Sequence, residues 1–230
     1  MRTNCVVFRR RLLVQRLQVA SRWTANICEN AANTEGVAVL KLLGRGGRTF
    51  RSLWMLEEAG IAYERELVDF ASGDTRSAAF LAINPNGKVP VLLDGDLVLF
   101  ESLAINCHIA RRYADAMWPS NAIDQSRTIA WLAWALGELE GPHDAANRTG
   151  TTIDASALDT SLEALRRALA GAPYLLGEHF TVADLNTASV LLRPQYRSVV
   201  RADDVLQDWF ERCAGRPALK RALAKNSGDG

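Results

Sequence analysis

Cysteine is scarce in this sequence, with only Cys5, Cys28, Cys107 and Cys213 among 230 residues. They form no Cys-x-x-Cys pair and no spacing typical of a zinc site. This pattern argues against a small fold held together by disulfides, and we expect no metal site. Scattered single cysteines indicate reduced thiols, which are typical of a cytoplasmic protein.

Long apolar runs and an excess of charge of one sign are also absent. No stretch approaches the roughly 20 apolar residues that span a bilayer, so no membrane segment is expected. The 27 lysines and arginines offset 26 aspartates and glutamates, which leaves a formal net charge of +1. Without a strong field of either sign, we expect neither nucleic acid nor a membrane surface as a partner.

The first 36 residues differ from the rest because they contain arginines but almost no acidic residues. The arginines before the first acid, Glu29, are Arg2, Arg9, Arg10, Arg11, Arg16 and Arg22. We expect residues 1–36 to be a disordered tail, or to lie upstream of the true start of translation. An organelle transit peptide, which has the same Arg-rich amphipathic composition, is the alternative.

From Val37 onward the pattern becomes that of a folded α/β domain. Residues 37–43 are apolar and β-branched, which predicts a buried strand. Apolar residues at helical spacing over residues 50–58 predict a helix ended by Gly60, and Ile61–Val68 predicts a second strand. A strand, a helix and a strand in this order form a βαβ unit, whose strands pair in parallel.

A hairpin and another helix are expected next. Two apolar runs, Val89–Leu93 and Leu97–Phe100, flank the turn Asp94-Gly95-Asp96. An Asp-Gly pair between such runs is a strong hairpin signal. Ser102 is expected to cap a helix that runs to about Tyr113.

No later segment alternates like a strand, so the rest of the chain is expected to be helical. Trp118-Pro119-Ser120 indicates a linker between the two parts. The sequence therefore predicts an α/β domain at residues 37–115 and an all-α domain at residues 121–226.

One stretch of the predicted α/β domain resembles a known ligand site. Asn84-Pro-Asn-Gly-Lys-Val-Pro-Val-Leu92, followed by Leu99-Phe-Glu-Ser102, resembles the glutathione site of cytosolic glutathione transferases. Tyr174-Leu-Leu-Gly-Glu-His-Phe-Thr-Val-Ala-Asp-Leu185 is a second similarity to that family. The resemblance extends from about Val37 to the C-terminus. It implies a thioredoxin-like glutathione-binding domain followed by an all-helical domain.

The resemblance also implies roles for five residues. It implies that the Val89–Pro90 bond is cis, which turns the Val89 backbone toward the cysteinyl backbone of glutathione. Glu101 and Ser102 match the residues that hold the γ-glutamyl end. The Ser102 hydroxyl and the free N–H groups of a helix start suit a carboxylate, and Glu101 suits an ammonium group. Lys88 can meet the glycyl carboxylate. The alternative is a hairpin and a capped helix without a ligand.

The catalytic position departs from the family pattern. Members usually place Ser, Tyr or Cys just after the first strand, facing the sulfur of glutathione, but here that position falls on Gly46 or Gly47. We therefore expect thiolate activation to depend on Arg48, with Thr49 as the second candidate. A guanidinium and a helix N-terminus both favour an anion. The alternative is that Arg48 and Arg51 are solvated charges and glutathione is bound without activation.

Two functions fit these residues. The first is a glutathione transferase that uses glutathione as co-substrate and activates its thiol for attack on a small hydrophobic electrophile, or for reduction of peroxides or disulfides. The second is a non-catalytic binding or regulatory protein of the same fold, which Gly46 and Gly47 favour. The resemblance implies a two-fold homodimer and no metal.

Other residues receive structural predictions. Trp131 and Trp134 share a helical spacing with nearby leucines, so we expect them in the core, with a pocket-lining role as the alternative. His143 and His179 are expected in loops without partners. Cys107 is expected to be a small buried residue rather than a nucleophile.

A helix start is expected in the second family-like segment. Thr181 and Asp184 have capping-box spacing, and Phe180 with Leu185 has the spacing of a hydrophobic staple. We assign this motif a folding role and no catalytic role.

Overall fold

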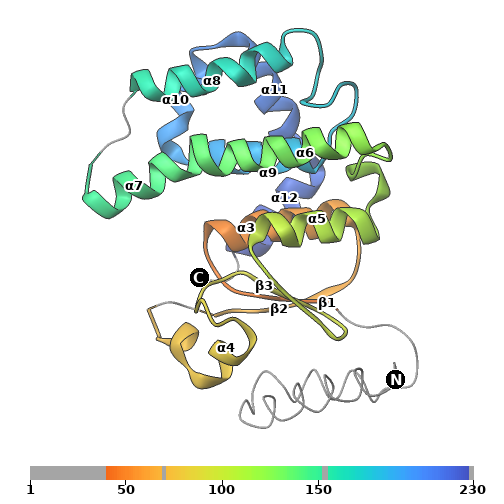
Figure 1. Ribbon diagram of the computed structural model, residues 1–230, viewed down its shortest axis with the longest axis vertical. Helices are drawn as coiled ribbons and strands as arrows, with labels where there is room; N and C mark the ends of the chain where they lie inside the picture. Colours follow the sequence, from red (N-terminus) through yellow and green to blue (C-terminus); the bar gives the residue numbers. More distant parts are fainter. Residues whose placement is uncertain (1–39, 69–70, 152–154, 228–230) are drawn as a thin grey trace, which may run out of the picture. The chain divides into compact units, whose positions relative to one another are not determined.

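The computed structural model describes residues 40–68, 71–151 and 155–227 (Figure 1). The expected N-terminal tail, residues 1–36, lies outside these ranges. Contacts divide the chain into two compact units. Unit 1 comprises the described residues up to Ser52 together with Ala62–Ile105, and unit 2 comprises Leu53–Ile61 together with the described residues from Asn106 onward. The domain boundaries expected from the sequence stay a prediction.

Unit 1 contains a four-stranded sheet in the order β2-β1-β3-β4. The strands are β1 (Leu40–Leu43), β2 (Tyr63–Glu66), β3 (Val91–Asp94) and β4 (Leu97–Phe100). β1 pairs in parallel with β2 and antiparallel with β3, and β3 pairs antiparallel with β4. The predicted βαβ unit, hairpin and thioredoxin-like architecture are therefore confirmed.

The turn of the hairpin has the geometry that its sequence favours. Asp94 pairs with Leu97, so the loop consists of Gly95 and Asp96. Gly95 has φ 57°, a left-handed conformation that glycine adopts without steric cost. The Asp-Gly signal therefore predicted the hairpin, but the loop is one residue shorter than the expected Asp94-Gly95-Asp96 turn, because Asp94 pairs within β3.

The central strands are apolar, and the edge strand beside β1 is charged. β3 is buried along its whole length, and Leu42 and Leu43 of β1 are fully buried. β2 is shorter than the predicted strand of residues 61–68. Lys41 of β1 forms ion pairs with Glu66 of β2 at 2.9 Å and with Glu64 at 3.7 Å. Charged side chains are usual on edge strands because one face or edge meets water.

One hydrophobic cluster of unit 1 lies between the sheet and α4 (Ala78–Ile83). Ser77 caps this helix, since its Oγ accepts the Phe80 N–H at 3.2 Å. The buried residues of this cluster are Leu43, Val68, Phe80, Ile83, Val91 and Leu93. Figure 1 shows α4 on one face of the sheet and the first turns of α3 (Gly47–Ala59) and α5 (Ser102–Tyr113) on the other.

Glycines set both ends of α3. Gly44 and Gly46, which precede the helix, have φ values of 136° and 93°. Gly60, with φ 64°, donates its N–H to the Leu56 carbonyl at 3.1 Å and ends the helix as predicted. Like α5, α3 begins in unit 1 and ends in unit 2.

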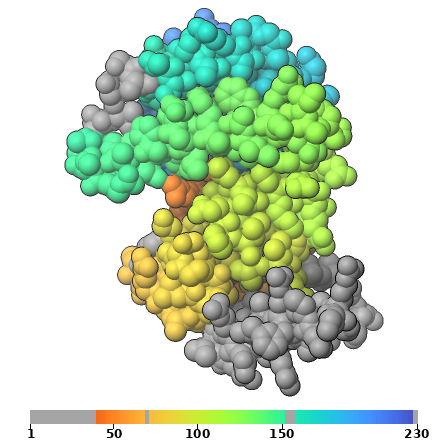
Figure 2. All heavy atoms as spheres, viewed as in Figure 1, coloured from red at the N-terminus to blue at the C-terminus, as the bar shows by residue number. Residues whose placement is uncertain are grey.

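The described part of unit 2 is helical, as predicted, apart from a single bridge between Tyr174 and Gly177. Its longer elements from residue 122 onward are α6 (Ala122–Trp134), the π-helix η3 (Ala135–Glu140), α7 (Gly141–Thr149), α8 (Ala155–Leu169), α9 (Val182–Leu191), α10 (Arg197–Arg201), α11 (Asp204–Ala214) and α12 (Pro217–Ser227). In α9, every residue except Ser189 is buried. Figure 2 shows α6 and α7, coloured green, across the face of unit 2 that is turned to the viewer.

The predicted capping box at the start of α9 is confirmed. Thr181 accepts the Ala183 N–H at 3.3 Å, and Asp184 accepts the Thr181 N–H at 3.0 Å. Oδ1 of Asp184 also accepts the Leu175 N–H at 2.9 Å and Trp209 Nε1–H at 3.0 Å. Burial raises the pKa of the Asp184 carboxyl, while these hydrogen bonds lower it.

The core prediction for Trp131 and Trp134 is wrong. Both side chains are half-buried, and their rings meet edge to face with centroids 5.1 Å apart. The buried positions of α6 are Thr128 and Leu132. The buried face of α6 is therefore centred on Thr128 and Leu132, with the two tryptophans beside it, and helical spacing alone did not identify that centre.

Two further single-residue predictions need correction. His143 lies in α7 rather than in a loop, and its ring nitrogens contact Gln195 Nε2 at 2.5 Å and Asn147 Nδ2 at 2.9 Å. Cys107 is half-buried rather than buried. Desolvation still raises the pKa of its thiol to about 11, so it remains a poor nucleophile.

Candidate functional site

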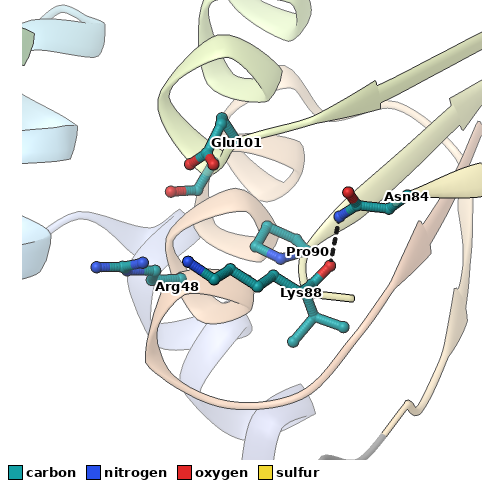
Figure 3. A pocket seen from close by; sticks show the side chains of 7 residues that line it. Arg48, Asn84, Lys88, Pro90 and Glu101 are labelled. Atoms are coloured by element: carbon teal, nitrogen blue, oxygen red, sulfur yellow. Dashed lines mark hydrogen bonds between the residues drawn. The ribbon is translucent and has the colours of Figure 1, made fainter. Parts of the chain in front are cut away.

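A small pocket in unit 1 collects most of the residues that the sequence singled out. It lies where the start of α3, the loop between α4 and β3, and the junction of β4 with α5 come together (Figure 3). The lining residues are Arg48, Asn84, Lys88, Val89, Pro90, Glu101 and Ser102. All of them except Asn84 are residues that the sequence assigned to the site.

Asn84 braces the loop that forms one wall. It is 2% exposed, and its Nδ2 donates to the Lys88 carbonyl at 2.7 Å, as the dashed line in Figure 3 shows. Its Oδ1 accepts the Asn86 N–H at 3.1 Å. Sequence reasoning missed this role, although an asparagine side chain that bonds the backbone two residues on is typical of an Asn-Pro-Asn-Gly turn.

The Val89–Pro90 peptide bond is cis, as expected from the resemblance. Its neighbour in space is Gly44, at the end of β1. A Cβ at Gly44 would lie 2.7 Å from the Val89 Cβ and 2.6 Å from the Thr49 Oγ1. The end of β1, the first turn of α3 and the cis bond therefore pack with room for no side chain between them.

The junction of β4 with α5 has an unusual backbone. Glu101 has φ 71°, and it alone among the described non-glycine residues has a positive φ. Such a conformation persists only where the surrounding structure holds it, and it is common at ligand sites. The Glu101 carbonyl accepts the first helical hydrogen bond, from the Ile105 N–H at 2.9 Å. Ser102 is consequently the first residue of α5 rather than its expected cap.

Ser102 and Arg51 meet in the interior of unit 1. Ser102 is 4% exposed and Arg51 is 2% exposed, and Arg51 Nη1 donates to the Ser102 Oγ at 3.3 Å. The alternative of a solvated Arg51 is therefore wrong. The signal that could have shown it is the spacing of three residues from Arg48, which places both arginines on the same side of α3.

Arg48 and Thr49 are adjacent in sequence but occupy different environments. Arg48 is half-buried and lines the pocket. Thr49 is fully buried, and its Oγ1 donates to the Arg45 carbonyl at 3.2 Å. Arg48 therefore lines the pocket together with the candidate binding residues, and Thr49 does not line it.

Gly46 and Gly47, where the resemblance leads one to expect a hydroxyl or a thiol, carry no side chain. A Cβ built at Gly46 or at Gly47 would meet no atom within 4 Å. The side chain that follows directly is Arg48. The chemistry available at this end of the pocket is therefore that of a cation and of the N–H groups at the start of α3.

The pocket separates charges of opposite sign. Arg48 and Lys88 extend along one side, and the Glu101 carboxylate lies on the other (Figure 3). The start of α5 adds unpaired N–H groups beside Ser102. This arrangement suits a small zwitterion with carboxylates and an ammonium group.

Two kinds of feature are absent from residues 40–68, 71–151 and 155–227. No group of three or more His, Cys, Asp and Glu side chains there is arranged to hold a metal ion. Within the same ranges, no helix is both long and apolar enough to cross a membrane.

Known proteins match both halves of the chain. The glutathione S-transferase N-terminal domain family matches residues 38–111, and the C-terminal domain family matches residues 144–224. Glutathione S-transferase 3 of Zea mays is 33% identical over 216 residues, covering 82% of this chain and 95% of that protein. Glutathione S-transferase GstB of Escherichia coli is 30% identical over 205 residues, covering 80% and 98%.

A solved structure shows the same likeness. Glutathione S-transferase I from maize, in complex with an atrazine–glutathione conjugate, is 30% identical with a TM-score of 0.66, covering 84% of this chain and 100% of that one. Fold, pocket and relatives agree, and the relatives are matched over nearly their whole length. The chain belongs to the glutathione S-transferase family of enzymes.

Proposed function

We propose that this chain binds glutathione in the pocket of unit 1 and activates its thiol for attack on a small hydrophobic electrophile. The observation that carries the proposal is the gathering of the predicted binding residues and Arg48 in one pocket. Relatives of known structure support it, because one was solved with lactoylglutathione and another with an atrazine–glutathione conjugate. Both ligands contain glutathione.

Each part of glutathione has a partner in this arrangement. The Ser102 hydroxyl and the N–H groups that open α5 hold the γ-glutamyl carboxylate, and Glu101 holds the ammonium group beside it. The Val89 backbone, presented by the cis bond, pairs with the cysteinyl backbone. Lys88 meets the glycyl carboxylate.

Activation of the thiol is the chemical task that remains. A free thiol has a pKa near 8.5, so only a few per cent is ionised at pH 7. Lowering that pKa by about two units requires roughly 2.7 kcal/mol of preferential stabilisation of the thiolate. Arg48 is the second residue of α3, so its guanidinium and the helix dipole would act on the same sulfur.

A second candidate function is non-catalytic glutathione binding. The observations that favour it are the bare backbone at Gly46 and Gly47 and the burial of the Thr49 hydroxyl. Reduction of peroxides or disulfides would use the same thiolate as conjugation. Turnover with an aryl halide and with a peroxide, measured beside glutathione affinity, separates the three possibilities.

The binding proposal is tested by removing the γ-glutamyl partners. Glu101→Ala combined with Ser102→Ala should weaken retention on immobilised glutathione by at least about tenfold, because hydrogen bonds to charged groups are worth about 1.5–3 kcal/mol each. Ser120→Ala combined with Glu178→Ala changes two exposed residues of the same types and is the matched control. Unchanged retention in a folded Glu101/Ser102 double variant would contradict the proposal.

We further propose that the protein is a homodimer. Apolar side chains remain uncovered in both units: Ile123 and Ile129 of α6 are 67% and 58% exposed, and Phe100 of β4 is 38% exposed. Apolar side chains mark a contact surface where they gather into a patch, and membership of the family supports a two-fold dimer. Light scattering at micromolar concentration should give twice the chain mass of 25.3 kDa. A mass of one chain would refute the dimer.

A further inference from the structure

The buried guanidinium of Arg51 contacts a residue of the pocket lining. Arg51 lies one turn beyond Arg48 on α3, is only 2% exposed, and does not belong to the pocket lining. Its Nη1 donates to the Oγ of Ser102 at 3.3 Å, and Ser102 does line the pocket. This buried bond joins the first turns of α3 and α5, which are 51 residues apart in the chain.

The direction of the bond determines what the Ser102 hydroxyl can do. Arginine carries donors only, so the hydroxyl oxygen must be the acceptor. The hydroxyl keeps its own proton, which can rotate toward an acceptor in the pocket. The guanidinium also polarises the hydroxyl and makes it a stronger donor. Ser102 is therefore prepared to donate a hydrogen bond to an anion.

The charge of Arg51 acts in the same direction. A carboxylate oxygen bonded to the Ser102 hydroxyl would lie within about 6 Å of the guanidinium, since an O–H···O⁻ bond adds only about 2.5–2.7 Å. The guanidinium is buried, so salt in the solvent screens it little. Glu101, next in the chain and exposed, supplies the opposite charge. The pair suits the α-carbon of an amino acid, which carries a carboxylate and an ammonium group together.

We propose that Arg51 is a positioning residue that orients the Ser102 hydroxyl and makes this end of the pocket select a carboxylate. The inference rests on the proposed glutathione function and adds to it a residue outside the pocket. It also gives different roles to the two arginines of α3. Arg48 acts on the thiol and therefore on kcat, whereas Arg51 acts on the γ-glutamyl carboxylate and therefore on KM for glutathione.

The test compares two ligands by calorimetry. One is glutathione, and the other is γ-aminobutyryl-cysteinyl-glycine, in which a hydrogen replaces the γ-glutamyl carboxylate. Arg51→Met should weaken glutathione binding by at least about tenfold and binding of the analogue by less than about threefold. Arg51→Lys keeps a positive donor and should recover part of the preference for glutathione. Arg201→Met, at an exposed arginine of unit 2, is the control and should change neither affinity.

The outcomes distinguish this inference from the function on which it rests. If Arg51→Met weakens the binding of both ligands equally, Arg51 has a merely structural role and the inference is overturned. The inference is also overturned if Arg51→Met weakens the binding of neither ligand. If Arg51→Met does not fold, Ser102→Ala should lose the preference, and adding Arg51→Lys should change it no further; an added loss overturns the inference. Wild-type protein that binds neither ligand overturns the proposed function and this inference with it.

Discussion

Replacement of Asp184 tests how unit 2 is held together. Its carboxylate is fully buried and accepts four hydrogen bonds. Oδ1 accepts from the Leu175 N–H and from Trp209 Nε1, and Oδ2 accepts from the N–H and the hydroxyl of Thr181 at 3.0 and 3.1 Å. Asp184→Ala removes both acceptors. The Thr181 hydroxyl can rotate, but three N–H groups keep their direction and lose their partner.

The size of the loss follows from these three groups. A buried donor left without an acceptor costs about 1–3 kcal/mol, so the lower half of that range gives about 3–6 kcal/mol for the three N–H groups in Asp184→Ala. Asp184→Asn keeps one oxygen for two of the N–H groups but directs an amide N–H₂ at the Thr181 N–H. Burial raises the pKa of the carboxyl, so the charged form carries a desolvation cost that asparagine avoids. We expect about 2 kcal/mol for this variant.

Urea unfolding at pH 7, followed by tryptophan fluorescence and far-UV circular dichroism, measures both losses. In a chain of this size, about 3–6 kcal/mol also lowers Tm by about 6–24 °C. Asp208→Ala is the control, because Asp208 is 72% exposed and pairs with Arg212 on its own helix. Its cost should be at most about 0.5 kcal/mol. The reasoning is refuted if Asp184→Ala costs no more than this control, or if asparagine costs as much as alanine.

Two further predictions concern the start of α3. Arg48→Ala should raise the pKa of the bound glutathione thiol and lower kcat with little change in affinity, whereas Thr49→Ala, at a buried hydroxyl, should leave that pKa unchanged. Spectroscopic titration of the bound thiolate checks this, and an unmoved pKa in Arg48→Ala would count against the proposed role. Gly44→Ala should cost more stability than Gly46→Ala, although both glycines have positive φ, because only at Gly44 would a Cβ meet atoms, at 2.6 and 2.7 Å. Equal midpoints in urea would exclude crowding as the cause.

The features that sequence reasoning found depend on neighbouring residues. The hairpin turn at Gly95 and the helix end at Gly60 both need a left-handed backbone, which glycine supplies. The capping box needs only Thr181 and Asp184 at a fixed spacing. The binding motif likewise lies in two short stretches around Val89 and Glu101. Local chemistry of this kind can be recognised from a single sequence.

The features that it missed depend on which distant segments meet. Arg51 looks like a surface charge until α5 brings Ser102 against it. Trp131 has the periodicity of a core residue, but periodicity identifies an apolar stripe and not the centre of the buried face. The ring of His143 contacts Gln195, which lies 52 residues further along the chain. Such pairings are set by tertiary packing, which residue type and spacing do not specify.

The empty space at Gly47 bears on how this protein can change by mutation. Gly47 has no positive φ, and a Cβ there would touch nothing within 4 Å, so its backbone accepts an ordinary side chain. A glycine codon that ends in a pyrimidine becomes a serine or a cysteine codon through a single base change. With such a codon at position 47, one base change supplies the hydroxyl or the thiol that the resemblance leads one to expect there, and the backbone accommodates either side chain.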